Sequence, residues 1–152
     1  MYNEFIADIS EIIVRDLKAM KEEVGMTPDE VLWEASPGII NPVGTLAYHI
    51  CGNLSHFIGA VLGKDGYLRD RYSEFNKKDL TKQELLLKID QTIDAIQKAL
   101  ADLGPEDLDQ PMPDTPPQHK GRSVGFFLIQ LCCHFSRHRG QLDYLRRMKL
   151  AR

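Results

Sequence analysis

The sequence has no apolar run long enough to cross a membrane and no excess of basic residues. None of its apolar stretches approaches the ~20 consecutive residues that a spanning helix needs. The 22 acidic residues outnumber the 19 lysines and arginines, and the net charge is −3. This balance lacks the basic footprint of a nucleic-acid-binding protein. We therefore expect neither a membrane nor a nucleic acid as a partner.

Cysteine is scarce, and its spacing excludes the common cysteine-based scaffolds. The three cysteines, Cys51, Cys132 and Cys133, form no CxxC pair, and their odd number does not suit a disulfide framework. No basic and apolar leader is expected before the first helical pattern. These features predict a cytoplasmic protein, and its 152 residues fit a single domain over residues 1–152.

Two metal-binding motifs are also missing. No glutamate follows His134, so the His-Glu-x-x-His motif, with its general base, is absent. No Glu-x-x-His occurs anywhere in the chain, which argues against a carboxylate-bridged di-iron bundle. If the chain binds a metal, it does so with another ligand set.

Four long segments carry apolar residues three and four positions apart, which predicts amphipathic helices at residues 2–24, 42–62, 82–103 and 124–148. We expect an all-α fold. The predicted core comprises Ile9, Ile13, Leu17, Leu46, Leu54, Leu86, Ile89, Ile93, Ile96, Leu100, Phe127, Leu131 and Leu142.

Helix-capping residues set the predicted boundaries. Gly25 is expected to end the first helix. Thr27 with Glu30 is expected to form a capping box for a short helix, in which Trp33 packs against the other helices. Asn41 is expected to cap the second long helix, which Pro42 would open. Thr81 with Glu84 predicts a second capping box, at the start of the third long helix.

The predicted connections are long. Residues 67–79 are polar and are interpreted as a loop that has room for a helical turn. Five prolines interrupt the stretch from Gly104 to Arg122. Its ~17 residues could extend over ~50 Å, enough to run back along a helix and start a parallel neighbour. Up to two such crossover connections are compatible with this sequence.

Basic residues concentrate near the C-terminus. They are expected to form the solvated face and the last turn of the fourth helix, where cations complement the carbonyl end of the helix dipole. They are Arg137, Arg139, Arg146, Arg147, Lys149 and Arg152.

The most informative motif is a pair of histidines, His134 and His138, four residues apart. In a helix both rings lie on one face, here the apolar one, so both point inward. Such histidines can be ordinary core residues or metal ligands. A third histidine, His49, falls among the apolar positions of the second helix. Three imidazoles with a fourth position left open are typical of catalytic metal sites.

Other residues near these histidines have two interpretations each. Asn53 and Gln141 lie one turn beyond His49 and His138, where each could orient a ring or could bond to backbone or water. Gly52 could leave space beside a metal. The remaining candidates are not expected to be ligands: His56 as a core or rim residue, His119 in a loop, and Cys132 and Cys133 at positions that do not share the face of the two histidines.

Together, His49 with Gly52-Asn53-Leu54 and the downstream His134-x-x-x-His138-x-Gly140-Gln141 resemble the DinB/YfiT-like family of metal-dependent enzymes. The resemblance implies a four-helix bundle with long crossover connections and a divalent metal held by His49, His134 and His138. It further implies a homodimer and a thiol-dependent S-transferase that acts on a small-molecule substrate with a low-molecular-weight thiol.

The residues themselves leave other functions open. A metal-dependent hydrolase, a metal-binding module without turnover and a helical dimerisation module all fit the sequence. An imidazole ligand set favours zinc or nickel, with iron or manganese as alternatives.

Overall fold

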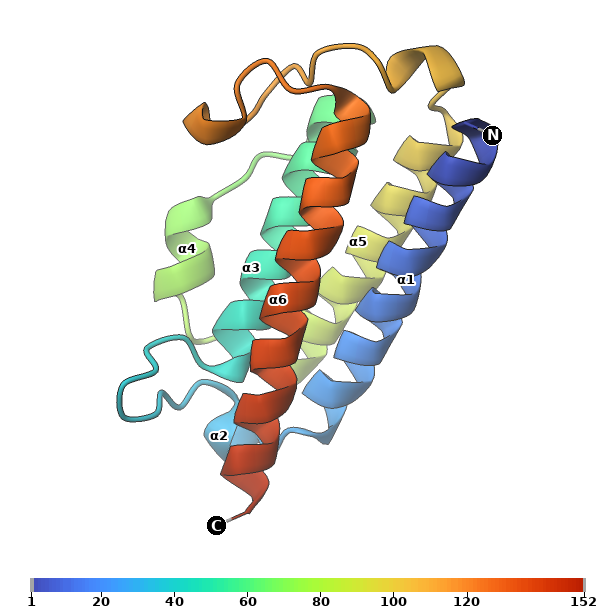
Figure 1. Ribbon diagram of the computed structural model, residues 1–152. Helices are drawn as coiled ribbons and strands as arrows, with labels where there is room; N and C mark the ends of the chain where they lie inside the picture. Colours follow the sequence, from blue (N-terminus) through green and yellow to red (C-terminus); the bar gives the residue numbers. More distant parts are fainter. Residues whose placement is uncertain (1, 152) are drawn as a thin grey trace.

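The computed structural model describes residues 2–151, with side chains from residue 4 onward, and within this range it contains helices and loops but no strand (Figure 1). The prediction of an all-α fold is confirmed. The long helices are α1 (Tyr2–Met26), α3 (Val43–Leu54), α5 (Lys82–Ala101) and α6 (Val124–Leu150). A π-helical segment, η1 (Ser55–Leu62), continues α3 without interruption. None of the described helices is both long and apolar enough to cross a membrane.

The shorter helices lie in the connections. They are α2 (Asp29–Leu32), α4 (Arg71–Asn76), and the 3-10 turns η2 (Pro105–Asp107) and η3 (Pro117–His119). The segment at residues 67–79 therefore contains a defined helix of six residues, α4, within the predicted loop.

The four long helices pack so that α5 and α6 each contact both α1 and α3. Ion pairs from Asp16 to Arg139 and from Glu23 to Arg146 join α1 to α6 at two levels, so these two helices run in the same direction. Helices α3 and α5 run in the opposite direction, as Figure 1 shows. As a result α3 and α6, which carry the three histidines, are antiparallel neighbours.

Only one of the connections between the long helices is a crossover, which makes consecutive helices parallel. This crossover connection, residues 63–81, carries α4 and runs back along the molecule, so α3 and α5 are parallel (Figure 1). The proline-rich connection at residues 102–123 is long enough to do the same, but it crosses one end of the molecule and starts the antiparallel α6. Its path is held by backbone hydrogen bonds from Val124 N to Gln110 O and from Met112 N to Arg122 O, each 2.9 Å long.

The predicted core is buried with one exception. Leu86 is only half-buried, and its neighbour Leu85 is fully buried instead. Helix α5 packs against both α1 and α3, so its buried stripe is wider than the narrow a/d seam from which Leu86 was predicted. The error is therefore confined to one position in the first turn of α5, since the rest of its predicted stripe is buried.

The two adjacent leucines provide a stability test. Leu85→Ala should lower the free energy of unfolding by about 2–5 kcal/mol, because a fully buried side chain leaves a cavity. Leu86→Ala should cost clearly less, because part of that side chain already contacts water. Urea unfolding followed by circular dichroism measures both changes. Equal losses in the two variants would contradict the packing of α5.

Two predicted helix starts are wrong. Helix α1 continues through Gly25 to Met26, and the Thr27 hydroxyl donates to the Glu23 carbonyl at 2.8 Å. Thr27 is thus bound to α1, and Pro28 takes the N-cap position of α2 without a side-chain cap. Pro42 likewise occupies the N-cap of α3, in place of Asn41.

Two of the long helices, α5 and α6, start at side-chain caps. Thr81 and Glu84 form the predicted capping box of α5, with the Glu84 amide donating to the Thr81 hydroxyl and the Thr81 amide donating to the Glu84 carboxylate. At the start of α6, the hydroxyl of Ser123 accepts from the Phe126 amide.

The connection between α1 and α3 is fixed by Trp33 and Lys149. Trp33 packs as predicted: its indole N–H donates to the Leu80 carbonyl at 2.9 Å, and a Cβ added at Gly44 would lie 2.7 Å from its ring. Lys149 was expected in solvent but is buried, with its ammonium 3.1 Å from the Ala35 carbonyl. Arg152 lies outside the described residues.

Candidate metal centre

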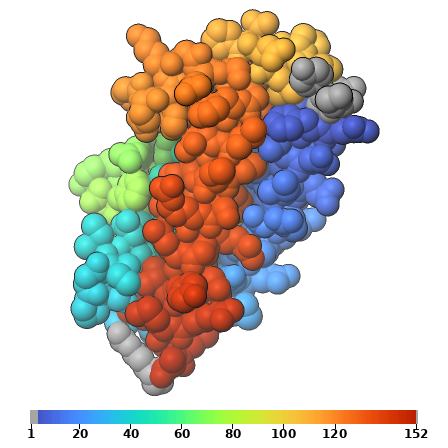
Figure 2. Space-filling model, in the orientation of Figure 1, coloured from blue at the N-terminus to red at the C-terminus, as the bar shows by residue number. Residues whose placement is uncertain are grey.

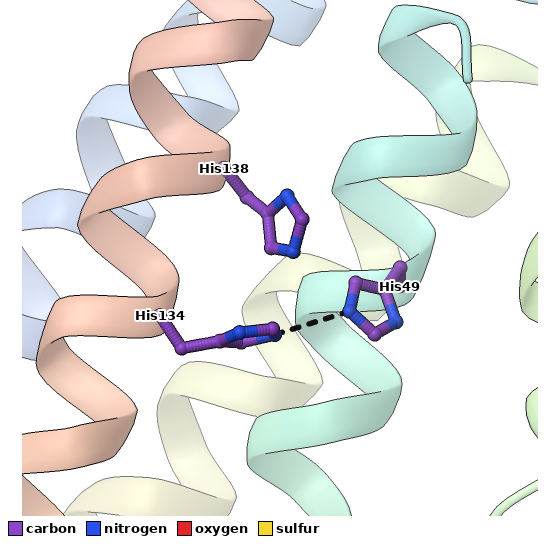
Figure 3. A group of neighbouring side chains, drawn as sticks. All are labelled: His49, His134 and His138. Carbon is purple, nitrogen blue, oxygen red and sulfur yellow. Dashed lines mark hydrogen bonds between the residues drawn. The ribbon is translucent and has the colours of Figure 1, made fainter. Parts of the chain in front are cut away.

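The three predicted histidines come together between α3 and α6, and each offers one ring nitrogen within 4.8 Å of those of the other two (Figure 3). His134 and His138 lie one turn apart on the face of α6 that packs against α3. His49 reaches them from α3, because the two helices are antiparallel neighbours. A set of this kind could hold a metal ion.

The rings are arranged around a common centre. His49 Nε2 and His134 Nε2 are 3.2 Å apart, and the ring centroids of the three residues lie 4.5–5.4 Å from one another. His49 is buried, whereas His134 and His138 are half-buried. The cluster is therefore enclosed on the His49 side and accessible on the side of α6.

Two of the three rings are held by a hydrogen bond at Nδ1. Gln141 Oε1 accepts from His138 Nδ1 at 2.8 Å, so of the two alternatives for Gln141 the structure contains the contact with the ring. His49 Nδ1 lies 2.9 Å from Glu74 Oε2, and Asn53 does not take part, so the orienting alternative for Asn53 is wrong. A ring that donates through Nδ1 keeps its Nε2 lone pair for a ligand.

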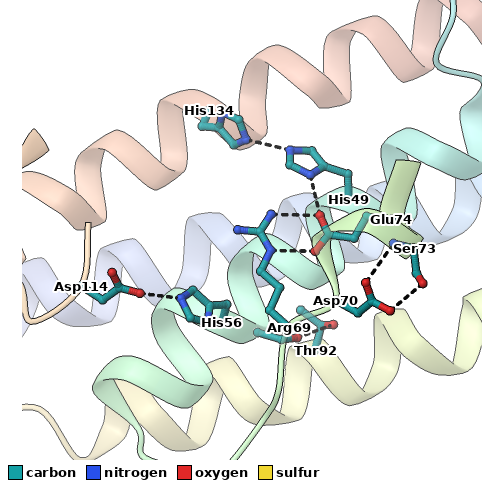
Figure 4. Close-up of polar contacts among 10 residues, drawn as sticks. His49, His56, Arg69, Asp70, Ser73, Glu74, Thr92, Asp114 and His134 are labelled. Carbon is teal, nitrogen blue, oxygen red and sulfur yellow. Dashed lines mark hydrogen bonds and ion pairs between the residues drawn. The ribbon is translucent and has the colours of Figure 1, made fainter. Parts of the chain in front are cut away.

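Glu74 comes from α4, in the crossover connection, and sequence analysis did not identify it. Its carboxylate is almost fully buried and accepts two hydrogen bonds from Arg69, at 2.7 Å and 2.9 Å (Figure 4). Burial alone would raise the pKa of Glu74, but the hydrogen bonds from Arg69 and His49 outweigh it and lower the pKa below its ordinary value. Glu74 is thus ionised at neutral pH and matches the Nδ1–H donor of His49.

Gly52 makes room for this carboxylate. A Cβ added at Gly52 would overlap the side chain of Glu74. The predicted space beside the site is therefore real, but Glu74 fills it. A sequence signal did exist for α4, since Asp70 caps it through the Ser73 amide at 3.0 Å. That signal marks a helix start and does not indicate where Glu74 points.

The imidazoles of α6 are uncharged at neutral pH. Burial, together with the neighbouring His138 and His49, lowers the pKa of His134 to about 4. Burial also lowers the pKa of His138, although the hydrogen bond to Gln141 opposes the shift. Because only a neutral imidazole can ligate a metal, this environment suits metal binding.

A pocket of about 580 Å³ opens beside the three histidines. Its walls come from α3 and η1, from the crossover connection, from the 102–123 connection and from α6. The last three segments meet on the face shown in Figure 2. The apolar part of the lining includes Phe57, Phe75, Phe127 and Leu131.

The remaining predicted candidates lie away from the cluster. His56, predicted as a core or rim residue, is half-buried on η1 and bonds to Asp114 Oδ2 at 2.8 Å, which ties the 102–123 connection to η1 (Figure 4). His119 lines the pocket from its loop, with its ring packed against Phe126 and Phe127. Neither belongs to the three-histidine cluster.

None of the three cysteines lines this pocket. Cys51 is buried on another face of α3, where burial raises the pKa of its thiol to about 12. Burial also raises the pKa of Cys132, to about 11, and Cys133 is exposed. The expectation that Cys132 and Cys133 stand outside the site agrees with this arrangement.

The fold and the site define an all-helical protein with a three-histidine cluster in an open pocket. The chain belongs to the protein family of unknown function DUF1572, whose family model matches residues 2–151. No curated protein matches the chain.

Proposed function

We propose that this chain is a DinB-like metal-dependent enzyme built on a four-helix bundle, in which His49, His134 and His138 bind one divalent metal ion. The observation that carries the proposal is the convergence of three imidazoles, two of which already have Nδ1 bound to a protein acceptor. Burying three imidazoles together is costly unless their nitrogens find partners, and one cation would accept all three lone pairs.

We further propose that the enzyme is a thiol-dependent S-transferase. A divalent ion held by the three histidines would act as a Lewis acid that lowers the pKa of a small-molecule thiol. In the transfer, the thiolate sulfur bonds to an electrophilic carbon of the second substrate. The leaving group departs with the bonding electron pair, and the thiol proton passes to solvent. The protein contributes binding, orientation and the apolar wall of the pocket.

The absence of a protein thiol in the pocket supports an external thiol. No cysteine lines the pocket, so a thiol nucleophile would have to enter as a substrate. Hydrolysis, the alternative, needs a general base near the reacting water. The carboxylate that lines the pocket, Asp114, is engaged with His56, and the one that contacts the cluster, Glu74, is engaged with Arg69 and His49. This pairing favours transfer of a thiol over hydrolysis.

The assay for this function measures consumption of a low-molecular-weight thiol in the presence of small electrophiles. Protein reconstituted with zinc or nickel should consume the thiol with multiple turnovers, whereas metal-free protein should not. A variant with all three histidines replaced by alanine should be inactive, and Cys51→Ser and Cys133→Ser should keep the activity.

Three outcomes would contradict the assignment. Turnover that persists in the triple variant would show that the histidines are not the site. Release of a hydrolysed product without any thiol would identify a hydrolase. Metal binding without turnover across the whole panel would identify a metal-binding module.

A further inference from the structure

Arg71 is an exposed residue in the first turn of α4, at the wall of the pocket. Its side chain lines the pocket, and its guanidinium carbon lies 5.2 Å from the centre of the Phe75 ring. Stacking on an aromatic face restrains a long side chain and leaves the N–H groups at its edge free to bind an acceptor. The Arg71 side chain is therefore restrained, and its N–H groups remain available to an acceptor.

The other two charged side chains that line the pocket, Arg69 and Asp114, are already paired. Arg69 donates two hydrogen bonds to Glu74, and Asp114 accepts from His56. Arg71, in contrast, makes no ion pair with any carboxylate in the part of the chain whose side chains are described. It is the cation in this pocket whose charge is left for a ligand.

Phe75 connects Arg71 to the histidine cluster. The centre of its ring lies 5.2 Å from the Arg71 guanidinium carbon and 4.7 Å from the ring centroid of His49. A small molecule could therefore contact Arg71 and the histidines at the same time. The part of the molecule between these two contacts would lie against the apolar lining, which includes Phe57 and Leu131.

We propose that Arg71 determines specificity for a substrate that carries a carboxylate, which it binds while the reactive end of the same molecule lies at the three histidines. A single guanidinium offers two parallel N–H groups, which match the two oxygens of a carboxylate. The position of the reactive end rests on the proposed function. The contact between the carboxylate and Arg71 does not, because Arg71 lies outside the histidine cluster.

The test compares thiols that differ in one group. Mercaptopropionate and mercaptohexanoate are titrated into the zinc-loaded protein by calorimetry, and each is paired with the alcohol of the same chain length. At least one acid should bind about tenfold more tightly than its alcohol, because a hydrogen bond to a charged group adds that much. Arg71→Gln should bring the ratio of the two affinities, acid over alcohol, close to one. Arg71→Lys should restore part of the preference for the acid.

Arg122→Gln is the matched control. Arg122 also stacks on a phenylalanine, with its guanidinium carbon 4.6 Å from the centre of the Phe126 ring, but it does not line the pocket. This variant should keep the wild-type ratio. The proposal is overturned if neither acid is preferred over its alcohol, or if the preference survives in Arg71→Gln.

A metal-free experiment separates this proposal from the proposed function. Nuclear magnetic resonance of the Arg71 Nε–H group is recorded in metal-free protein as mercaptopropionate, or its alcohol, is added. The acid should shift this signal and the alcohol should not. If zinc does not bind at all, the metal-dependent function fails while this signal still decides the role of Arg71. An unchanged signal with the acid would overturn the proposal.

Discussion

Replacing any one of His49, His134 and His138 by alanine should weaken zinc binding by a hundredfold or more. Wild-type protein is expected to bind about one zinc ion per chain. Each lost imidazole removes one of three protein ligands, and a ligand's share of a typical zinc-binding free energy corresponds to about two orders of magnitude. Calorimetry with metal-free protein gives the affinity, and elemental analysis after reconstitution gives the stoichiometry.

Two further histidines provide controls for this prediction. His119→Ala removes a ring that lines the same pocket, and His56→Ala removes one that bonds to Asp114. Both variants should bind zinc as the wild type does. If the triple alanine variant still binds one zinc ion per chain, the metal site and the enzymatic proposal built on it are wrong.

Glu74→Ala should lower the free energy of unfolding by about 3–5 kcal/mol, because it leaves a buried charge without its partner. The side chain of Arg69 is only 13% exposed, and Glu74 accepts two of its hydrogen bonds. The same change leaves His49 Nδ1 without an acceptor, so zinc affinity should also fall, by about 10–100-fold. Urea unfolding and calorimetry measure the two effects.

Two variants make this test specific. Asp114→Ala breaks an exposed carboxylate–histidine pair and should cost less than about 1 kcal/mol. Gly52→Ala keeps Glu74 but forces its carboxylate aside, and should weaken zinc binding through His49. A Glu74→Ala variant that unfolds at the wild-type urea concentration would contradict the role assigned to the pair.

The contribution of Glu74 to the free energy of unfolding depends on pH, and the direction of this dependence follows from its pKa. The pKa of Glu74 is lower in the folded protein than its ordinary value, so the folded state binds this proton more weakly than the unfolded state does. The stabilisation is therefore complete above the ordinary carboxyl pKa and is lost as the pH falls through the lowered one. The difference in stability between wild type and Glu74→Ala should shrink over that acidic range.

Much of the helical structure was predictable because its causes are local. Apolar residues three and four positions apart define a helix face wherever the chain lies. The capping box of Thr81 and Glu84 needs only residues three apart, and the structure contains it. The failed caps at Thr27 and Asn41 show the limit of such signals. Helix α1 continues one residue beyond Gly25 and its Glu23 carbonyl accepts the Thr27 hydroxyl, while Pro42 takes the N-cap position of α3.

The candidate site also has a part that is set within one helix and a part that depends on contacts between helices. Within α6, the four-residue spacing of His134 and His138 and the three-residue spacing of His138 and Gln141 are set by helix geometry, so the sequence by itself determined that these groups share a face. Tertiary structure decided the rest. It placed His49 opposite that face, buried Leu85 in the core in place of Leu86, and brought Glu74 to His49 in place of Asn53. A helix repeats every 3.6 residues, so short spacings fix neighbours within it, whereas contacts between helices depend on how whole faces pack and on the path of the chain between them.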